Sequence, residues 1–332
     1  MKKILLIATG GTIASKPTAA GLAPQISSDE ILRSVPEAAA FCEIDAVQLL
    51  NLDSTNINYR HWLQIASCIQ QHYARYDGFV ITHGTDTMAY SLAALSYLIQ
   101  NSPKPIVFTG SQKSIHEKDT DARSNLLNAF VYAADAHAQG VRLVFDNRVI
   151  LGTRARKLRT KSYNAFSSID YPEIAIFRDH KLLYYIEEAA PAAGPFFYTA
   201  LDPRVFVLKL IPGMDAHIFS YLEEHYDAVI LESFGVGGVP CYGDEAFLDA
   251  IHRFLQSGKT LVMATQVPFE GSDMEVYQVG FQLKERYEVL EAYTMTLEAA
   301  VTKLMWILAR TQDRAEVRRL FYTPIAKDIL LP

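Results

Sequence analysis

The sequence predicts an α/β fold: a mostly parallel sheet flanked by helices, in a larger N-terminal domain and a smaller α/β C-terminal domain. Short apolar runs that are continuous rather than alternating are typical of strands covered on both faces. Longer amphipathic segments separate these runs, and strand and helix in alternation favour a parallel sheet. The length of 332 residues exceeds what one hydrophobic core usually serves, so two domains are expected.

The expected strands recur along the whole chain. They are Ile4–Ala8, Phe79–Thr82, Ile106–Thr109, Leu143–Phe145, Val205–Leu210, Val229–Leu231 and Leu261–Ala264. Two of the segments between and after them have the 3.6-residue apolar period of a helix. These segments are Arg60–Tyr76 and Leu297–Leu308.

A proline-rich segment, Glu187–Pro203, interrupts this alternation. Its three prolines and Gly194 cannot continue a helix or a central strand, so the segment is typical of a linker. We therefore expect an N-terminal domain over 1–187, a linker over 188–203 and a C-terminal domain over 204–332. No internal repeat is evident.

Composition and charge exclude several classes of protein. Half of the residues are hydrophobic, which excludes intrinsic disorder, and the net charge of -6 disfavours general nucleic-acid binding. Cys42, Cys68 and Cys241 lack the spacing of a disulfide framework or a zinc site. The apolar run Ile4–Ala8 is too short for a signal peptide, and no run is long enough to span a membrane. A soluble, cytoplasmic protein is expected.

Small and polar residues follow three of the expected strands. The first strand leads into Thr9-Gly10-Gly11-Thr12, the strand at Phe79 into His83-Gly84-Thr85-Asp86-Thr87, and the strand at Ile106 into Gly110-Ser111-Gln112. Ligands of doubly wound sheets lie beyond the carboxyl ends of the strands, where glycines allow a close approach of the backbone. These three turns are expected to share one edge of the sheet.

Each turn allows a functional and a purely structural interpretation. The Gly10-Gly11 turn matches neither a dinucleotide fingerprint nor a P-loop, and Thr12 could simply begin a helix. Thr85 and Asp86 fit a Thr–Lys–Asp arrangement, in which a lysine removes the threonine proton and a carboxylate holds the lysine. The alternative is that Asp86 caps the next helix.

Two further segments bear on this site. Arg154, Arg156, Lys157, Arg159 and Lys161 form a basic cluster, interpreted either as a patch for anions or nucleic acid, or as a solvated hairpin with one inward-pointing lysine. The acidic net charge and the lack of interleaved aromatic residues favour the hairpin, but spacing does not identify the lysine. Asp53 and Ser54 form either an ordinary turn or a site for a ligand carrying ammonium and carboxylate groups.

Taken together, these motifs resemble the bacterial-type L-asparaginase family, in its cytoplasmic type I branch. The resemblance covers nearly the whole chain. Its strings are TGGTIA at 9–14, LDST at 52–55, DGFVITHGTDTMAY at 77–90, the Lys157 region and EAAVTKLMW at 298–306. The combination of TGGTIA with HGTDT is far more specific than either string alone.

The resemblance implies hydrolysis of L-asparagine to L-aspartate and ammonia, with no metal and no cofactor. It implies that Thr12 is the nucleophile and forms a β-aspartyl ester, which water then hydrolyses. It further implies a homodimer or homotetramer with shared active sites. The residues given other roles are Thr85, Asp86 and Lys157 as the proton-relaying trio, Gly11 and Thr85 as oxyanion donors, and Asp53, Ser54, Thr55 and Asp86 as contacts of the substrate's α-groups.

Three departures from the family's pattern bear on these roles. Leu22 stands where some relatives have a tyrosine near the nucleophile, so the residue that activates Thr12 is open. Val267 replaces a cysteine of an allosteric pocket, so hyperbolic kinetics are expected, and Tyr293 and Thr294 replace residues of a GGDMT motif. The alternatives are the asparaginase-like subunit of a tRNA-dependent amidotransferase, disfavoured because the chain starts at its first strand, and a non-catalytic amino-acid sensor, which would not need all four catalytic residues.

Overall fold

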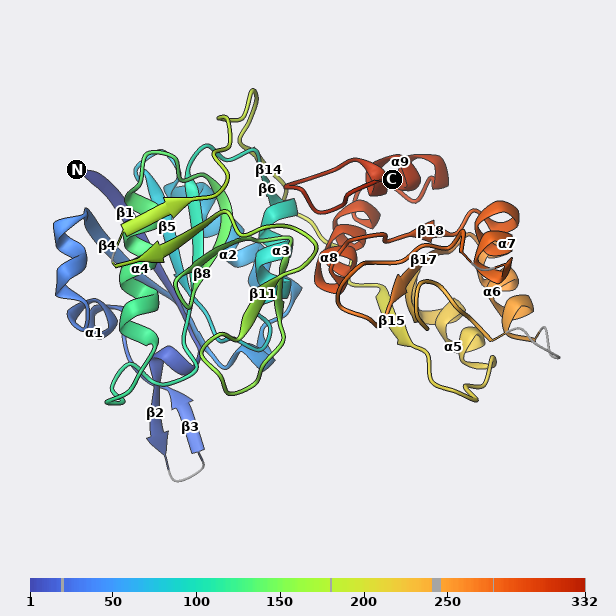
Figure 1. The fold of residues 1–332 in the computed structure, drawn as a ribbon, viewed down its shortest axis with the longest axis horizontal. Coiled ribbons are helices and arrows are strands. Elements are labelled where there is room, and N and C mark those ends of the chain that lie inside the picture. The colour runs from blue at the N-terminus through green and yellow to red at the C-terminus, as the bar shows by residue number, and fades with distance from the viewer. Residues whose placement is uncertain (19–20, 180, 241–245, 277, 332) are drawn as a thin grey trace. The chain divides into compact units, whose positions relative to one another are not determined.

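The computed structural model describes residues 1–332 except 19–20, 180, 241–245, 277 and 332. The chain forms two compact units, Met1–Thr199 and Ala200–Pro332 (Figure 1). Both units are α/β, and both contain a sheet with parallel strands, which confirms the predicted fold class.

The sheet of the first unit has a parallel part and an antiparallel part. Its eight strands lie in the order β13 (Lys181–Tyr184), β12 (Ala175–Arg178), β9 (Arg148–Leu151), β8 (Gly140–Phe145), β7 (Pro105–Thr109), β5 (Gly78–Thr82), β1 (Lys2–Gly10) and β4 (Cys42–Leu52). From β4 to β8 all neighbours are parallel, and β9, β12 and β13 continue the sheet antiparallel.

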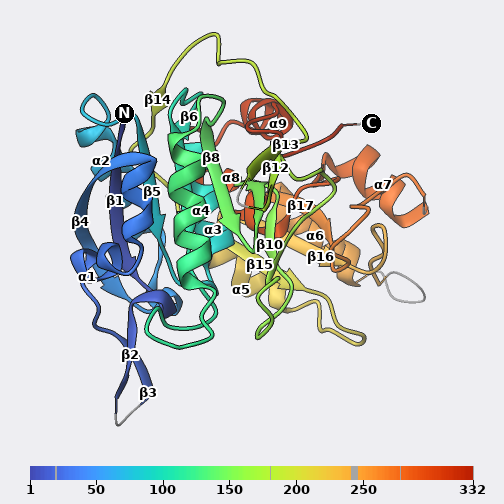
Figure 2. The ribbon, with the colours of Figure 1, turned by 60° about the vertical axis from the view of Figure 1, so that its left-hand side comes forward.

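Helices cover this sheet, and Figure 2 shows α4 in front of its strands. The helices are α1 (Ser28–Arg33), α2 (Tyr59–His72), α3 (Met88–Leu98) and α4 (Ala122–Ala134). Ile4, Leu6 and Val80 pack in one core with Leu126 and Phe130 of α4. Successive side chains of a strand point to opposite faces of the sheet. In the central strands β5 and β7 the side chains on both faces are buried, as their continuous apolar runs predict.

Short elements complete the first unit. They are the pairs β2 (Ser15–Thr18) with β3 (Gly21–Pro24), β10 (Ala155–Lys157) with β11 (Phe166–Ser168), and β6 (Ile99–Gln100) with β14 (Phe196–Phe197), besides the 3-10 turns Thr12–Ala14, Pro36–Ala40 and Ser54–Asn56. The pair β10 and β11 is the hairpin expected for the basic segment. The expected linker, 188–203, includes β14, which pairs with the first unit.

The second unit has a sheet of four parallel strands. Their order is β15 (Val205–Lys209), β16 (Ala228–Ser233), β17 (Thr260–Thr265) and β18 (Leu290–Glu291). Its helices are α5 (Ile218–His225), α6 (Ala246–Gln256), α7 (Gln278–Tyr287), α8 (Leu297–Leu308) and α9 (Arg314–Tyr322). Phe219, Phe247 and Phe254 form the aromatic centre of its core. In neither unit does a described helix have the length and apolarity needed to cross a bilayer.

Two of the three cysteines are buried in the first unit. Cys42 and Cys68 are free thiols, and burial raises the pKa of both, that of Cys42 to about 11. Such thiols are protonated and unreactive at neutral pH, which fits Cys68 as a core residue of α2. Cys241 lies outside the described residues.

Candidate active site

Three turns of the first unit touch one another at the carboxyl ends of β1, β4 and β5. Gly11 has a φ of 79°, and a Cβ added to it would lie 2.3 Å from the backbone nitrogen of Gly84. A Cβ on Gly84 would in turn lie 2.7 Å from Ser54 Oγ. Only glycine fits either close approach, and the positive φ at Gly11 also favours glycine. The sequence predicts that three turns share one edge. The turns after β1 and β5 do so, the turn after β7 meets them because a Cβ on Gly110 would lie 2.3 Å from the His83 carbonyl oxygen, and Ser54 joins them.

Thr12 directly follows this contact. It begins the 3-10 turn Thr12–Ala14, whose N-cap residue, Gly11, has no side chain to offer. Ile13 and Ala14 are buried, and Ser15 Oγ donates to the Gly11 carbonyl at 2.9 Å, which anchors the turn to the core. The Thr12 side chain is half-buried and has no hydrogen-bond partner among the described residues. Its hydroxyl is thus available to a ligand.

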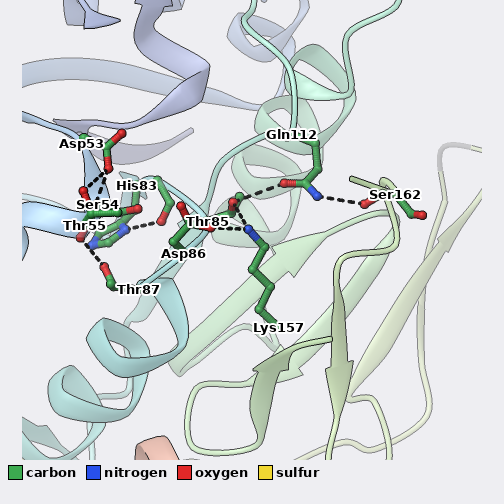
Figure 3. A network of polar contacts seen from close by, with 11 residues as sticks. Asp53, Ser54, Thr55, His83, Thr85, Asp86, Thr87, Gln112, Lys157 and Ser162 are labelled. Atoms are coloured by element: carbon green, nitrogen blue, oxygen red, sulfur yellow. Dashed lines mark hydrogen bonds and ion pairs between the residues drawn. The ribbon is translucent and has the colours of Figure 1, made fainter. Parts of the chain in front are cut away.

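Lys157 joins Thr85 to Asp86. From the hairpin strand β10 its ammonium donates to Thr85 Oγ1 at 2.8 Å and to Asp86 Oδ1 at 2.6 Å (Figure 3). Thr85 is 5% exposed, the Lys157 side chain 14% and the Asp86 side chain 59%. The lysine nitrogen therefore lies between a buried hydroxyl and a solvated carboxylate. This is the Thr–Lys–Asp arrangement that the sequence motifs suggest, and the structure identifies Lys157 as the inward-pointing lysine.

Gln112 is a contact of Thr85 to which the sequence motifs assign no role. The Thr85 hydroxyl donates to Gln112 Oε1 at 3.2 Å, and Gln112 Nε2 donates to the Ser162 carbonyl at 3.1 Å (Figure 3). The carboxylate of Asp121 accepts the backbone N–H groups of Gln112 and Lys113. Burial raises the pKa of Asp121, and these N–H groups oppose that rise. A signal for Gln112 was present in the sequence, because it ends the third polar turn.

Asp53 and Thr55 form a small turn beside Ser54. Asp53 Oδ1 accepts from the Thr55 N–H at 2.8 Å and from the Thr55 hydroxyl at 2.7 Å. Thr87 Oγ1 donates to the Ser54 carbonyl at 2.7 Å, which ties this turn to the start of α3. Asp53 is exposed, and within the described part of the chain its Oδ2 carries no hydrogen bond. Both interpretations of Asp53 thus apply, since the turn is ordinary and leaves one carboxylate oxygen available.

The role of oxyanion donor, which the family resemblance implies for the Gly11 N–H, does not fit the geometry. The Gly11 N–H donates to the Leu52 carbonyl at 2.9 Å, so in this conformation it is not available as an oxyanion donor. Its single N–H proton is already used in joining the turn after β1 to the end of β4. The Thr12 and Thr85 N–H groups, by contrast, have no acceptor among the described residues.

Other residues singled out from the sequence lie elsewhere. Val267, Tyr293 and Thr294 belong to the second unit, and the side chain of Leu22 lies outside those the structure describes. Lys161 is exposed, whereas Arg154 is buried. No group of three or more His, Cys, Asp or Glu side chains in the described ranges is placed to hold a metal ion.

Two family models match the two units. Residues 3–190 match the N-terminal asparaginase domain, and residues 204–321 match the C-terminal domain of glutaminases and asparaginases. The chain belongs to the asparaginase family.

Relatives in this family match the chain along nearly all of its length. It is 37% identical to an L-asparaginase of Thermococcus kodakarensis, over 98% of this chain and 99% of that protein. It is 33% identical to L-asparaginase 1 of Escherichia coli K12, over 96% and 95% of the two chains. A glutamyl-tRNA(Gln) amidotransferase subunit of Thermofilum pendens is 32% identical, over 98% of this chain and 75% of that protein.

Solved asparaginase structures have the same fold. The thermostable L-asparaginase of Thermococcus kodakarensis superposes with a TM-score of 0.92, covering 99% of this chain and 100% of that one. A probable cytoplasmic L-asparaginase of Campylobacter jejuni, 25% identical, superposes with a TM-score of 0.83 over 97% and 99% of the two chains.

Proposed function

We propose that this chain is an L-asparagine amidohydrolase that releases L-aspartate and ammonia through an acyl-enzyme on Thr12. The observation that carries the proposal is the contact of Lys157 with both Thr85 and Asp86, at the edge where the Thr12 hydroxyl is available. Membership of the asparaginase family supplies the substrate class.

In the first half of the reaction Thr12 Oγ1 attacks the side-chain amide carbonyl of asparagine. The carbonyl oxygen becomes an oxyanion, and the C–N bond then breaks. The proton of the Thr12 hydroxyl reaches the departing nitrogen, which leaves as ammonia. A β-aspartyl ester of Thr12 remains. A threonine is a weak nucleophile until a base takes its proton, so a proton acceptor near Thr12 is required.

The oxyanion is stabilised by backbone N–H groups. The Thr12 and Thr85 N–H groups follow the two glycines that are in contact, Gly11 and Gly84, and neither has another acceptor in the part of the chain described. We assign the oxyanion contact to these two, in place of the Gly11 N–H. One such donor is worth about 10²–10³ in kcat.

In the second half of the reaction water hydrolyses the ester. The lysine first gives up one ammonium proton to solvent; Thr85 then takes a proton from the attacking water while its own proton passes to Lys157 Nζ. When the bond between the acyl carbon and Thr12 Oγ1 breaks, Lys157 returns a proton through Thr85 to Thr12 Oγ1, and L-aspartate leaves. Asp86 Oδ1 accepts from the lysine nitrogen at 2.6 Å and holds it beside Thr85. A positioned base contributes about 10²–10⁴-fold, and neither it nor one oxyanion donor alone reaches the roughly 10⁶-fold typical of the slower enzymes.

The α-groups of asparagine bind beside Ser54. The open oxygen of Asp53 and the exposed carboxylate of Asp86 suit the α-ammonium group, and Ser54 and the backbone around Thr55 suit the α-carboxylate. The geometry of Asp53 supports this, because Thr55 occupies only Oδ1. These steps use no metal or cofactor.

The likeness to the amidotransferase subunit supports one alternative, in which this chain is the asparaginase-like subunit of a tRNA-dependent amidotransferase. Free L-asparagine then would not be turned over efficiently by this protein alone. The third possibility, an amino-acid sensor, would bind asparagine without releasing ammonia.

Ammonia release decides among these functions. We expect the purified protein to release ammonia from L-asparagine, and Thr12→Ala to abolish this release. Thr199→Ala, an exposed threonine of the same unit, is the matched control and should be fully active. L-glutamine and D-asparagine define the specificity. Binding without turnover would support the sensor, and full activity of Thr12→Ala would overturn the nucleophile.

We also propose a cytoplasmic homodimer or homotetramer whose subunits share active sites. The name of the Campylobacter jejuni relative, a probable cytoplasmic L-asparaginase, supports the location. The particle mass, measured by light scattering, tests the assembly. A monomer with full activity would contradict shared sites.

A further inference from the structure

His83 lies directly beneath the proposed site and has no role in the steps above. It follows β5, is fully buried, and is covered by Phe108 at a ring distance of 5.9 Å. Its ring makes two hydrogen bonds: Nδ1 lies 2.7 Å from the Gly84 carbonyl oxygen, and Nε2 lies 2.8 Å from Ser91 Oγ. A buried imidazole with two close partners has a defined orientation.

The partners also define where the ring proton lies. The Gly84 carbonyl can only accept, so Nδ1 carries a hydrogen. Burial lowers the pKa of His83 to about 4, although its bond to Gly84 opposes the change, so the ring is neutral at pH 7. In a neutral imidazole the second nitrogen has no proton. Nε2 therefore accepts, and the Ser91 hydroxyl donates to it.

Trp62 completes this chain of hydrogen bonds. An indole N–H can only donate, and Trp62 Nε1 lies 2.8 Å from Ser91 Oγ. Ser91 thus accepts from α2 and donates to His83, so every donor points toward the active-site turn. Trp62 and Ser91 are buried on α2 and α3, and neither belongs to the proposed catalytic groups. The direction of the chain is fixed at its far end by the indole.

The receiving carbonyl belongs to the peptide group that also carries the Thr85 N–H. In a planar trans peptide the C=O and N–H bonds point in opposite directions. Because His83 holds the Gly84 oxygen, the Thr85 N–H is turned the other way, and it has no acceptor among the described residues. Donation to the oxygen also polarises the peptide, which strengthens its N–H as a donor.

We propose that His83, as its Nδ1–H tautomer set by Ser91 and Trp62, is a positioning residue that aims the Thr85 N–H at the oxyanion. The inference rests on the proposed function, because it needs an oxyanion to stabilise. The contribution arises only when negative charge develops on the carbonyl oxygen. It therefore raises kcat more than it lowers KM.

Two substitutions at His83 separate this role from a purely structural one. Asparagine can retain a donor near the position of Nδ1, whereas leucine fills similar space without any donor. We expect His83→Leu to lower kcat by about 10- to 100-fold with little change in KM, as a misaimed catalytic group does. His83→Asn should recover most of the lost kcat. Ser91→Ala, which removes the acceptor and donor that set the tautomer, should lower kcat less than His83→Leu.

The tautomer itself is tested on the unaltered protein. Nitrogen NMR of protein labelled with ¹⁵N-histidine should show His83 as the Nδ1–H form near pH 7, its signals assigned by their absence from His83→Asn. An Nε2–H tautomer would overturn the proposal, even if His83→Leu failed to fold. So would a folded His83→Leu with wild-type kcat, or equal losses in the leucine and asparagine variants. Absence of ammonia release by the unaltered protein would instead overturn the proposed function and leave the NMR result as the test of this hydrogen bond.

Discussion

Replacing Lys157 with methionine separates the proposed proton relay from the stability of the fold. Methionine retains an unbranched stem of similar length but has no ammonium group. The change removes the donor at 2.8 Å from Thr85 Oγ1 and at 2.6 Å from Asp86 Oδ1. Thr85 keeps its bond to Gln112, so its hydroxyl is not left without a partner.

The structure predicts very different effects on stability and on rate. The Asp86 side chain is 59% exposed, so water replaces the lysine as its partner. An ion pair in such a setting is worth about 0–1 kcal/mol. The relay, however, carries the proton of the attacking water, and loss of a positioned base costs about 10²–10⁴-fold in kcat, or about 3–5 kcal/mol of barrier. The loss of activity should thus far exceed the loss of stability.

The assay follows ammonia release under saturating L-asparagine, with urea denaturation in parallel. Lys161→Met, an exposed lysine of the same basic segment, is the matched control and should behave as the unaltered protein. If Lys157 acts on the attacking water, Lys157→Met should also accumulate the β-aspartyl ester on Thr12, detectable by intact-protein mass spectrometry. A kcat within about threefold of wild type would refute the relay, since a positioned base is worth at least about 100-fold.

Three further predictions concern other parts of the chain. Gly11→Ala should destabilise the first unit and abolish activity, because its Cβ would meet the Gly84 nitrogen at 2.3 Å. Gly213 has a similar φ of 78° but open space around it, so Gly213→Ala should show only backbone strain of about 1–3 kcal/mol. Equal losses of stability in urea denaturation of the two variants would contradict this explanation. Because burial lowers the pKa of His83, the unfolded chain binds a proton at a higher pH than the folded chain does. The contribution of His83 to the free energy of unfolding is therefore full above pH 6.5 and is lost as the pH falls toward 4, by about 3 kcal/mol in total. Denaturation of His83→Asn at several pH values should lack this slope. Lys303→Met should lower the free energy of unfolding by about 3–5 kcal/mol, because it leaves the Asp328 carboxylate buried without its cation. The double variant Lys303→Met with Asp328→Asn should be much less destabilised. A double variant as unstable as the single one would contradict a charge effect.

How much of the fold could be predicted depended on burial. Strands β1, β5 and β7 have nearly every side chain buried, and their continuous apolar runs identified them. Strand β4 was not predicted, although it is the longest strand of that sheet, because it pairs only with β1 and is half-exposed. Its sequence, CEIDAVQLLNL, mixes charged and apolar residues without a clear period. An edge strand of this kind depends on a neighbour that the local sequence does not reveal.

The antiparallel strands of the first sheet were missed for a different reason. β9, β12 and β13 have four residues each, too few to show a period. In the site, the turns after β1 and β5 could be brought together from the sequence, because parallel strands share a carboxyl edge. Gln112 and His83 could be placed near that edge but given no role, because a hydrogen-bond direction depends on partners that are distant in sequence.

The positions of Thr12 and Thr85 in this site follow from the register of two parallel strands. Ala8 of β1 pairs with Thr82 of β5, so Thr12 and Thr85 lie four and three residues beyond paired positions. The sheet thereby supplies proximity without any side-chain contact between the threonines. Orientation has to come from elsewhere, since a glycine-containing turn is flexible by itself. It comes from packing that leaves no room for a Cβ at Gly11 and Gly84, and from His83, which holds the Gly84 carbonyl. A rigid arrangement made from flexible residues explains why a single methyl group at Gly11 should be as damaging to catalysis as the loss of Lys157.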